Sequence, residues 1–283
     1  MGASMKDIKR RIRSVESTKQ ITKAMELVAS SKLRKAKERA EASRPYFNAL
    51  YQAISDIAYN NTDFSSVYTQ RREAKKSLYI VIAGDRGLAG GYNANIFRLA
   101  GQEMAGKDAS VIAIGKKACE HYSREPHRLA AQYPGVAEEI NIVTAGEIAR
   151  EVIRQYQAGE ADEVYLLFTQ FVTALTQTPT ALKVLPLSFE GEEPGAHREL
   201  VIYEPSAEAV FDHIVPEYVA GMILGAAVES FASEQGARRT AMEAATDNAD
   251  EMISDLSLRY NRARQGAITQ EITEIVSGAT AAE

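Results

Sequence analysis

The sequence predicts an α/β protein in which two long terminal helices form an antiparallel coiled coil, with a small α/β domain inserted between them in the chain. Residues 208–283 have the pattern of one helix of about 70 residues, and residues 4–59 that of a second. Residues 77–203 alternate instead between short apolar strands and helices. We therefore divide the chain into an N-terminal coiled-coil helix at 1–60, an α/β domain at 61–205 and a C-terminal coiled-coil helix at 206–283.

Composition and charge narrow the class of protein. Of 283 residues, 45% are hydrophobic, which is enough for a packed core and excludes general disorder. Cys119 is the only cysteine, so we expect a reducing, intracellular environment. No run of 18 apolar residues and no signal-peptide core occurs, so we expect no membrane span.

The two ends of the chain carry opposite charge. Residues 5–40 hold 12 Lys or Arg against 4 Asp or Glu, whereas residues 204–283 hold 5 against 14. The basic face has three interpretations: a solvated surface, a partner of the acidic C-terminal helix or of an acidic protein loop, or a nucleic-acid site. Interleaved aromatics are missing and the chain is acidic overall, which argues against nucleic acid.

The first helix has a narrow, broken apolar stripe, so it needs a long neighbour for stability. Pro45 lies within it, and we expect a kink there and an end near Tyr59. The stripe consists of Ile8, Ile12, Val15, Ile21, Met25, Val28, Leu33, Ala36 and Ala40.

The last helix carries a more regular stripe with alternating spacings of three and four, which is typical of a coiled-coil seam. We expect a local bend at Pro216. The stripe consists of Met242, Ala245, Ala249, Met252, Leu256, Tyr260, Ala263 and Ala267. Beyond Ala267 the apolar set shifts by one position, which indicates either a change of partner or simple drift of the helical period.

The lengths of the two helices predict an overhang. Two antiparallel helices of unequal length leave about 13 residues, or roughly 20 Å, of the C-terminal helix without an intramolecular partner. This overhang contains Ile268, Ile272, Ile275 and Val276. We therefore expect another molecule to surround it.

The middle of the chain predicts a small Rossmann-like α/β domain. Expected strands lie at 77–83, 110–114, 163–168 and 200–203, with a hairpin over 168–187. Expected helices lie at 93–104, 116–123 and 145–157, and an acidic loop at 190–198. A glycine-rich turn, 84–93, follows the first strand.

Catalytic and metal sites are not predicted. The glycine turn follows neither the dinucleotide-binding nor the P-loop spacing, so a tight structural turn is favoured over a phosphate site. The four histidines lack metal-ligand spacing, and no nucleophile triad is evident. We expect no catalytic residue, no metal and no cofactor.

Several long runs of residues resemble the γ subunit of F-type ATP synthases, of the bacterial type. They span the chain from end to end: TKQITKAMELVA at 18–29, DRGLAGGYN at 85–93, AATDNA at 244–249, YNRARQ at 260–265 and ITQEITEIV at 268–276. Ala89 stands where the family commonly has Cys, and Gly236 and Gly266 stand where it commonly has Ala. Gly266 either loosens the helix before the tip or allows a close approach.

The resemblance implies a central-stalk rotor of a proton-translocating ATP synthase that performs no chemistry itself. It implies three α and three β subunits, an ε subunit and a membrane c-ring as partners, at the cytoplasmic face of the cell membrane. It also implies an apolar sleeve around the tip, and acidic loops facing the basic helix. The positions expected to contact the surrounding ring are Lys19, Lys23, Met25, Arg259, Arg262, Arg264, Gln265, Ile268, Ile272, Ile275 and Val276.

Overall fold

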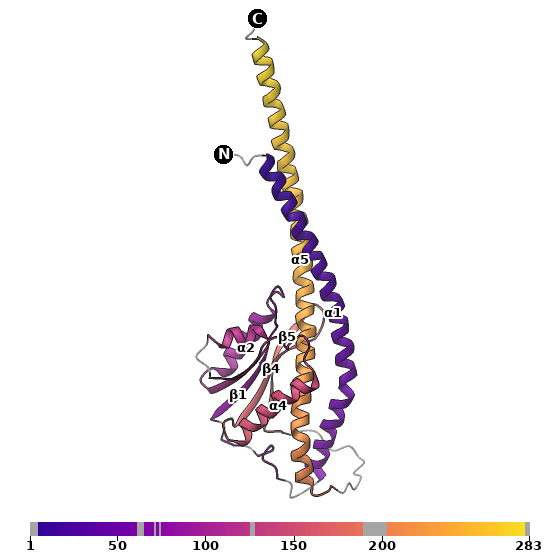
Figure 1. Cartoon of the computed structure of the whole chain (residues 1–283), viewed down its shortest axis with the longest axis vertical. Coiled ribbons are helices and arrows are strands. Elements are labelled where there is room, and N and C mark those ends of the chain that lie inside the picture. The colour runs from indigo at the N-terminus through magenta and orange to yellow at the C-terminus, as the bar shows by residue number, and fades with distance from the viewer. Residues whose placement is uncertain are drawn as a thin grey trace. The chain divides into compact units, whose positions relative to one another are not determined.

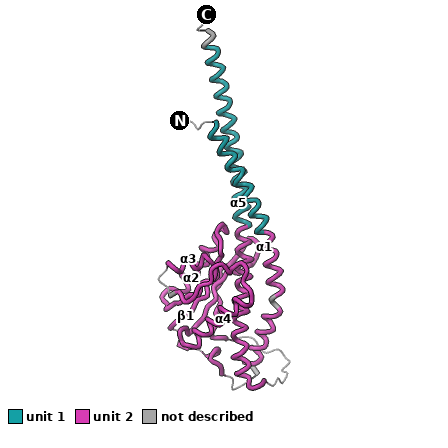
Figure 2. Tube along the Cα trace, in the orientation of Figure 1, with its two compact units in different colours: residues 1–29, 239–283 teal, residues 30–238 magenta. Residues whose placement is uncertain are grey.

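The computed structural model describes residues 5–60, 65–70, 72–73, 75–124, 128–188 and 203–280 (Figure 1). Two long helices, α1 (Met5–Asn60) and α5 (Ala207–Thr280), contain 56 and 74 residues, which confirms the predicted terminal helices. The chain forms two compact units (Figure 2). Unit 1 holds residues 1–29 and 239–283, and unit 2 holds residues 30–238.

Unit 2 contains a five-stranded sheet in the order β3-β2-β1-β4-β5. The first four strands in this order run parallel and β5 runs antiparallel to β4, which confirms a Rossmann-like domain. The strands are β1 (Lys76–Ile82), β2 (Asp108–Ile114), β3 (Arg128–Tyr133), β4 (Glu163–Phe171) and β5 (Gln177–Leu185).

Helices cover both faces of this sheet. One face packs on α2 (Tyr92–Met104) and α3 (Lys116–Tyr122) through residues such as Ile96 and Cys119. The other packs on α4 (Ile142–Gln157), on the end of α1 through Ile54 and Ile57, and on the start of α5. The central strands β1, β2 and β4 are therefore largely buried on both sides, as their continuous apolar sequences predict.

Helix α5 is, by length and composition, apolar enough to cross a membrane, and half of its apolar window is buried in the protein. Four of its large side chains, Phe211, Val215, Val219 and Ile223, are fully buried in the core of unit 2. A core helix passes the same composition test, so we assign this stretch to the core.

The helix pair of unit 1 is antiparallel, because Lys19 meets Asp250 whereas Thr22, further along α1, meets the earlier Thr246. Its seam differs from the predicted stripes. Ile21, Val28 and Met252 were expected inside but are 58%, 56% and 45% exposed. Polar Thr22, Glu26 and Thr246 and the small Ala29 are buried instead, whereas four members of the predicted stripes are buried as expected: Ile8, Met242, Ala249 and Leu256. Ala267, at the end of the predicted stripe, is exposed.

The seam differs from the predicted stripes for a physical reason. The predicted stripes followed apolar side chains, but the Thr22 and Thr246 hydroxyls lie 2.8 Å apart and satisfy each other inside the seam. Thr246 also lies 2.8 Å from the Met242 carbonyl oxygen. Because their polar atoms are paired, these threonines occupy seam positions at little cost, and their apolar neighbours face outward.

Within unit 2 the same two helices also run antiparallel. Phe47 of α1 lies against Gly221 and Gly225 of α5, while Leu33 and Ala36 cluster with Ala232. A Cβ on Gly221 would meet the Phe47 ring at 2.5 Å, so the close approach requires glycine at that position.

Two further expectations differ in detail, whereas the predicted continuation of both long helices through a proline is confirmed. Strand β3 was not predicted, because it is a partly exposed edge strand without clear alternation. Helix α4 begins at Ile142, earlier than expected, since the Asn141 side chain accepts a hydrogen bond from the Thr144 N–H. Both Pro45 and Pro216 lie inside continuous helices. The predicted loop at 190–198 and nearly all of the strand at 200–203 lie outside the described residues.

Candidate functional site

The predicted contact residues all lie in unit 1, on its two helices. Lys19 forms an ion pair with Asp250 at 2.5 Å, and Lys23 one with Glu26 at 3.0 Å. The Lys19 and Lys23 side chains remain 40% and 55% exposed. The basic end therefore pairs in part with the acidic C-terminal helix, one of the alternatives that the charge pattern left open. These pairs also weaken the nucleic-acid interpretation, since the cations are partly neutralised.

The arginine cluster of α5 lies on an exposed surface. Arg259 pairs with Asp255 at 2.8 Å. Arg262, Arg264 and Gln265 are exposed, and neither arginine forms an ion pair among the described residues. The guanidinium groups of Arg262 and Arg264 therefore remain available to acceptors on another molecule.

The predicted apolar tip is exposed. Ile268, Ile272 and Ile275 are 45%, 57% and 67% exposed, and Val276 is 59% exposed. Equal steps along both helices from the Thr22–Thr246 pair place Met5, the first described residue of α1, opposite Ala263. The tip thus extends past the described part of α1, as the unequal helix lengths predict.

Further exposed apolar side chains were missed by sequence reasoning. Besides Ile21 and Val28, the outside of the helix pair carries Leu27 and Leu258, which are 61% and 56% exposed. The signal was present in the spacing, because the unbroken alternation of four and three runs through polar residues. That series is Ile8, Ile12, Val15, Lys19, Thr22, Glu26, Ala29, Leu33 and Ala36. Following it would have placed Ile21 and Val28 outside.

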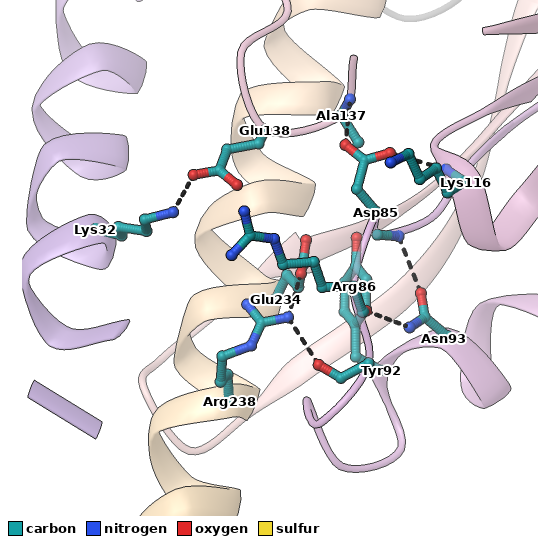
Figure 3. A network of polar contacts seen from close by, with 12 residues as sticks. Lys32, Asp85, Arg86, Tyr92, Asn93, Lys116, Ala137, Glu138, Glu234 and Arg238 are labelled. Carbon is teal, nitrogen blue, oxygen red and sulfur yellow. Dashed lines mark hydrogen bonds and ion pairs between the residues drawn. The ribbon is translucent and has the colours of Figure 1, made fainter. Parts of the chain in front are cut away.

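The glycine turn of unit 2 is held by a polar network (Figure 3). Asp85 accepts three backbone N–H bonds, from Lys116 and Gly135 at 2.8 Å and from Ala137 at 3.1 Å. Asn93 accepts the Gly84 N–H at 2.9 Å. The turn is thus joined to the start of α3 and to the loop after β3, which fixes its shape.

The same turn contacts α5 through a buried ion pair. Arg238 donates to Glu234 at 2.5 Å and to the Gly87 carbonyl oxygen at 3.1 Å. The Glu234 and Arg238 side chains are only 6% and 10% exposed. Burial raises the pKa of Glu234, and the charge of Arg238 opposes that rise.

This packing favours the structural interpretation of the glycine turn. A Cβ on Gly84 would lie 2.9 Å from the carboxyl carbon of Glu234, so glycine is needed for the close approach. Leu88 and Gly90 have positive φ values of 61° and 55°, as a tight turn requires. A carboxylate beside Gly84 would also repel a phosphate, whereas phosphate-binding turns present free N–H groups.

We also searched the described part of the chain for metal-binding clusters and cavities. No group of three or more His, Cys, Asp or Glu side chains there is arranged to hold a metal ion. Two open cavities of about 260 and 360 Å³ lie in unit 2. The first is lined by Lys32, Lys35 and Arg39 beside Phe231, and the second by Phe47 and Phe171 beside Lys37.

Comparison with known proteins identifies the family. The model of the ATP synthase family matches residues 4–282. The chain is 52% identical over 280 residues to an ATP synthase gamma chain of Ruminococcus albus, covering 97% of each. The chain belongs to the ATP synthase γ-chain family. It is also 45% identical to the ATP synthase gamma chain, sodium ion specific, of Acetobacterium woodii, covering 99% of each.

Solved structures agree with this assignment of the γ chain. A chain in the central stalk/c-ring structure of the Tetrahymena thermophila mitochondrial ATP synthase is 25% identical, with a TM-score of 0.63. The match covers 80% of this γ chain and 99% of that chain. A chain in the Euglena gracilis mitochondrial ATP synthase shares the fold, with a TM-score of 0.73 at 19% identity over 98% and 94% of the two chains.

Proposed function

We propose that this γ chain is the non-catalytic central-stalk rotor subunit of an ion-translocating ATP synthase. It turns together with a membrane c-ring and an ε subunit, inside a ring of three α and three β subunits. The asymmetric helix pair contacts the three β subunits differently and so shifts each between conformations of different nucleotide affinity. The complex lies at the cytoplasmic face of the cell membrane.

The observation that carries the proposal is the set of exposed apolar side chains on the outside of the helix pair in unit 1, beside a seam that also buries polar residues. Thr22 and Thr246 are buried in its seam, whereas Ile21, Leu27 and Val28 are more than half exposed. Exposed apolar residues on a long helix indicate a partner surface. Apolar contact has no preferred direction, so a shaft covered by it can rotate in a sleeve without being held at one angle.

The polar positions complete this role. Lys19 and Lys23 are partly exposed beside Met25, and they meet acidic loops of β as the shaft turns. Arg264 and Gln265 hydrogen-bond a β loop, and Arg259 and Arg262 enlarge this cationic patch. Such charge-assisted contacts favour particular angles, and so they supply the angular dependence that the apolar surface lacks.

The proposal is the same for proton and sodium coupling, because torque rather than the ion passes through a central shaft. The family resemblance implies protons, and the name of the Acetobacterium woodii relative specifies sodium. The coupled ion is therefore a property of the membrane ring to which the chain binds.

The test is reconstitution with purified α and β subunits, measuring assembly size and ATP hydrolysis together. We expect one stable complex whose hydrolysis rate falls when the chain is truncated after Ala267, which removes the exposed tip. A matched control, Glu271→Ala, changes an exposed polar residue of the same segment and should leave the rate unchanged. An α–β ring that works equally well without the γ chain would contradict the proposal.

A further inference from the structure

A row of buried polar side chains runs along the face of α5 that meets the α/β domain. We define this polar row as Ser230, Ser233, Glu234 and Arg238. Ser233 and Glu234 are adjacent; they lie three and four residues after Ser230 and five and four before Arg238, which places the four on one side of the helix. Both serines are fully buried, and the side chains of Glu234 and Arg238 are 6% and 10% exposed. Each member has a partner in a different part of the α/β domain or within the row.

The partners lie at the ends of two parallel strands. Ser233 donates to the Thr169 carbonyl oxygen of β4 at 2.9 Å, and the Ser230 oxygen accepts the Thr169 N–H at 3.3 Å. Ser230 also lies 2.8 Å from the Tyr92 hydroxyl, which follows the glycine turn. Arg238 donates to the carbonyl oxygen of Gly87 in that turn.

Stability alone does not explain the row. Burying an ion pair is often no better than an apolar replacement, because desolvation cancels the attraction between the charges. The best-supported use of buried polar groups is to fix one register among several. The large, fully buried apolar side chains of α5, Phe211, Val215, Val219 and Ile223, all precede the row, whereas the small residues Ala226, Ala227 and Ala232 flank it. Alanines alone define the register weakly at this level of the helix, so the polar row supplies the directional contacts there.

We propose that the polar row locks the axial and rotational register of α5 on the α/β domain, so that torque passes from the domain to the shaft without slip. This inference rests on the proposed rotor function. Directional hydrogen bonds to Thr169 and Gly87 resist sliding and twisting, whereas apolar contact does not. Asp85, with its three backbone partners, carries the load from the turn to the start of α3 and to the loop after β3.

The test uses the complete ATP synthase reconstituted in liposomes, with ATP hydrolysis and ATP-driven ion pumping measured on the same samples. Two paired variants, Ser230→Ala with Ser233→Ala and Glu234→Leu with Arg238→Met, remove halves of the row, and a fourfold variant removes all of it. Arg239→Met, next to the row but outside it, is the matched control. Arg238→Lys tests rescue, because its ammonium group keeps the charge facing Glu234.

We expect each pair to lower the number of ions pumped per ATP hydrolysed, by about threefold or more in the fourfold variant, while assembly and hydrolysis persist. Arg238→Lys should retain more coupling than Arg238→Gln, and Arg239→Met should match the wild type. If the fourfold variant does not assemble, the proposal is judged from the coupling of the two paired variants and from the comparison of Arg238→Lys with Arg238→Gln.

Two results would overturn the lock. The first is a wild-type number of ions pumped per ATP hydrolysed in both paired variants and in Arg238→Gln. The second is a parallel fall of pumping, hydrolysis and thermal stability in these variants, which would indicate a general loss of structure. Failure of the rotor proposal itself looks different: the wild-type chain would then support no pumping at all.

Discussion

The hydroxyl groups of Thr22 and Thr246 lie 2.8 Å apart in the seam of the helix pair, where a coiled coil ordinarily has apolar side chains. Both residues are buried, at 8% and 7% exposed. The contact joins α1 to α5 between residues 224 positions apart in the chain. It fixes which positions face inward, and hence which apolar residues face outward.

Replacing both threonines should cost less than the two single changes suggest. Thr22→Val or Thr246→Val alone leaves one buried hydroxyl with fewer partners and should cost about 1 kcal/mol. The double variant removes both polar groups, so its cost should be smaller than the sum of the single costs. Urea denaturation of the full chain, followed by circular dichroism, measures the coupling. Strictly additive costs would show that the hydroxyls do not interact.

Gly84→Ala should destabilise unit 2 by about 1–3 kcal/mol, because its Cβ would lie 2.9 Å from the buried Glu234 carboxyl group. Glu234 cannot move away without losing Arg238. Gly87→Ala is the matched control in the same turn, since its Cβ would meet nothing within 4 Å. Thermal unfolding of both variants separates them, and equal melting temperatures would refute the close packing on α5.

Two glycines of α5 should respond in opposite directions to alanine. At Gly221 the new Cβ would meet the Phe47 ring at 2.5 Å, so we expect a loss of about 1–3 kcal/mol. At Gly225 the nearest ring atom would be 3.6 Å away. There the better helix propensity should stabilise by up to about 1 kcal/mol. A shared sign of the two changes in chemical denaturation would rule out the close contact between Gly221 and Phe47.

Glu234 should make the stability of the γ chain depend on pH. Because burial raises the pKa of Glu234, the folded chain holds this proton more tightly than the unfolded chain does. Its contribution is therefore fully present below the unfolded pKa, about 4.3, and is lost as pH rises through the folded pKa. Glu234→Gln removes this dependence. The difference in unfolding free energy, wild type minus Glu234→Gln, should thus fall as pH increases above about 4.3. A difference that stays flat or rises would contradict the shift.

Arg264→Ala should weaken the action of the shaft on β without unfolding it. The side chain is exposed and has no ion pair among the described residues, so far-ultraviolet circular dichroism should not change. ATP hydrolysis by the reconstituted complex should fall. Glu251→Ala, at another exposed position of α5, is the control. A large loss of helicity in the Arg264 variant would assign the residue a structural role instead.

The elements with a clear period were predictable from the sequence. Helices α1 and α5 and the buried strands β1 and β4 follow from helical or strand-like apolar patterns. The exact seam was not, because Thr22 and Thr246 look unfavourable until each is seen to satisfy the other. The exposed edge strand β3 lacked a distinctive pattern.

The glycine turn shows the same limit for the candidate site. Its unusual spacing predicted a structural turn rather than a phosphate-binding loop, and the packing on α5 favours the same interpretation, but its partner on α5 could not be deduced. Gly84 and Glu234 are far apart in the chain, and neither residue type specifies the other. A tertiary contact of this kind leaves no trace in local propensity, whereas the exposed tip at Ile268 follows directly from two unequal helix lengths.

The outward-facing apolar residues also matter before the chain reaches any partner. A newly made γ chain presents Ile21, Val28 and the tip at Ile272 to water, where two such chains can cover these surfaces on each other. Self-association of this kind depends on concentration, whereas the correct assembly needs other subunits to be present. Synthesis of the γ chain in excess of those subunits therefore carries an aggregation hazard. A cell benefits from producing the γ chain and its partner subunits in matched amounts.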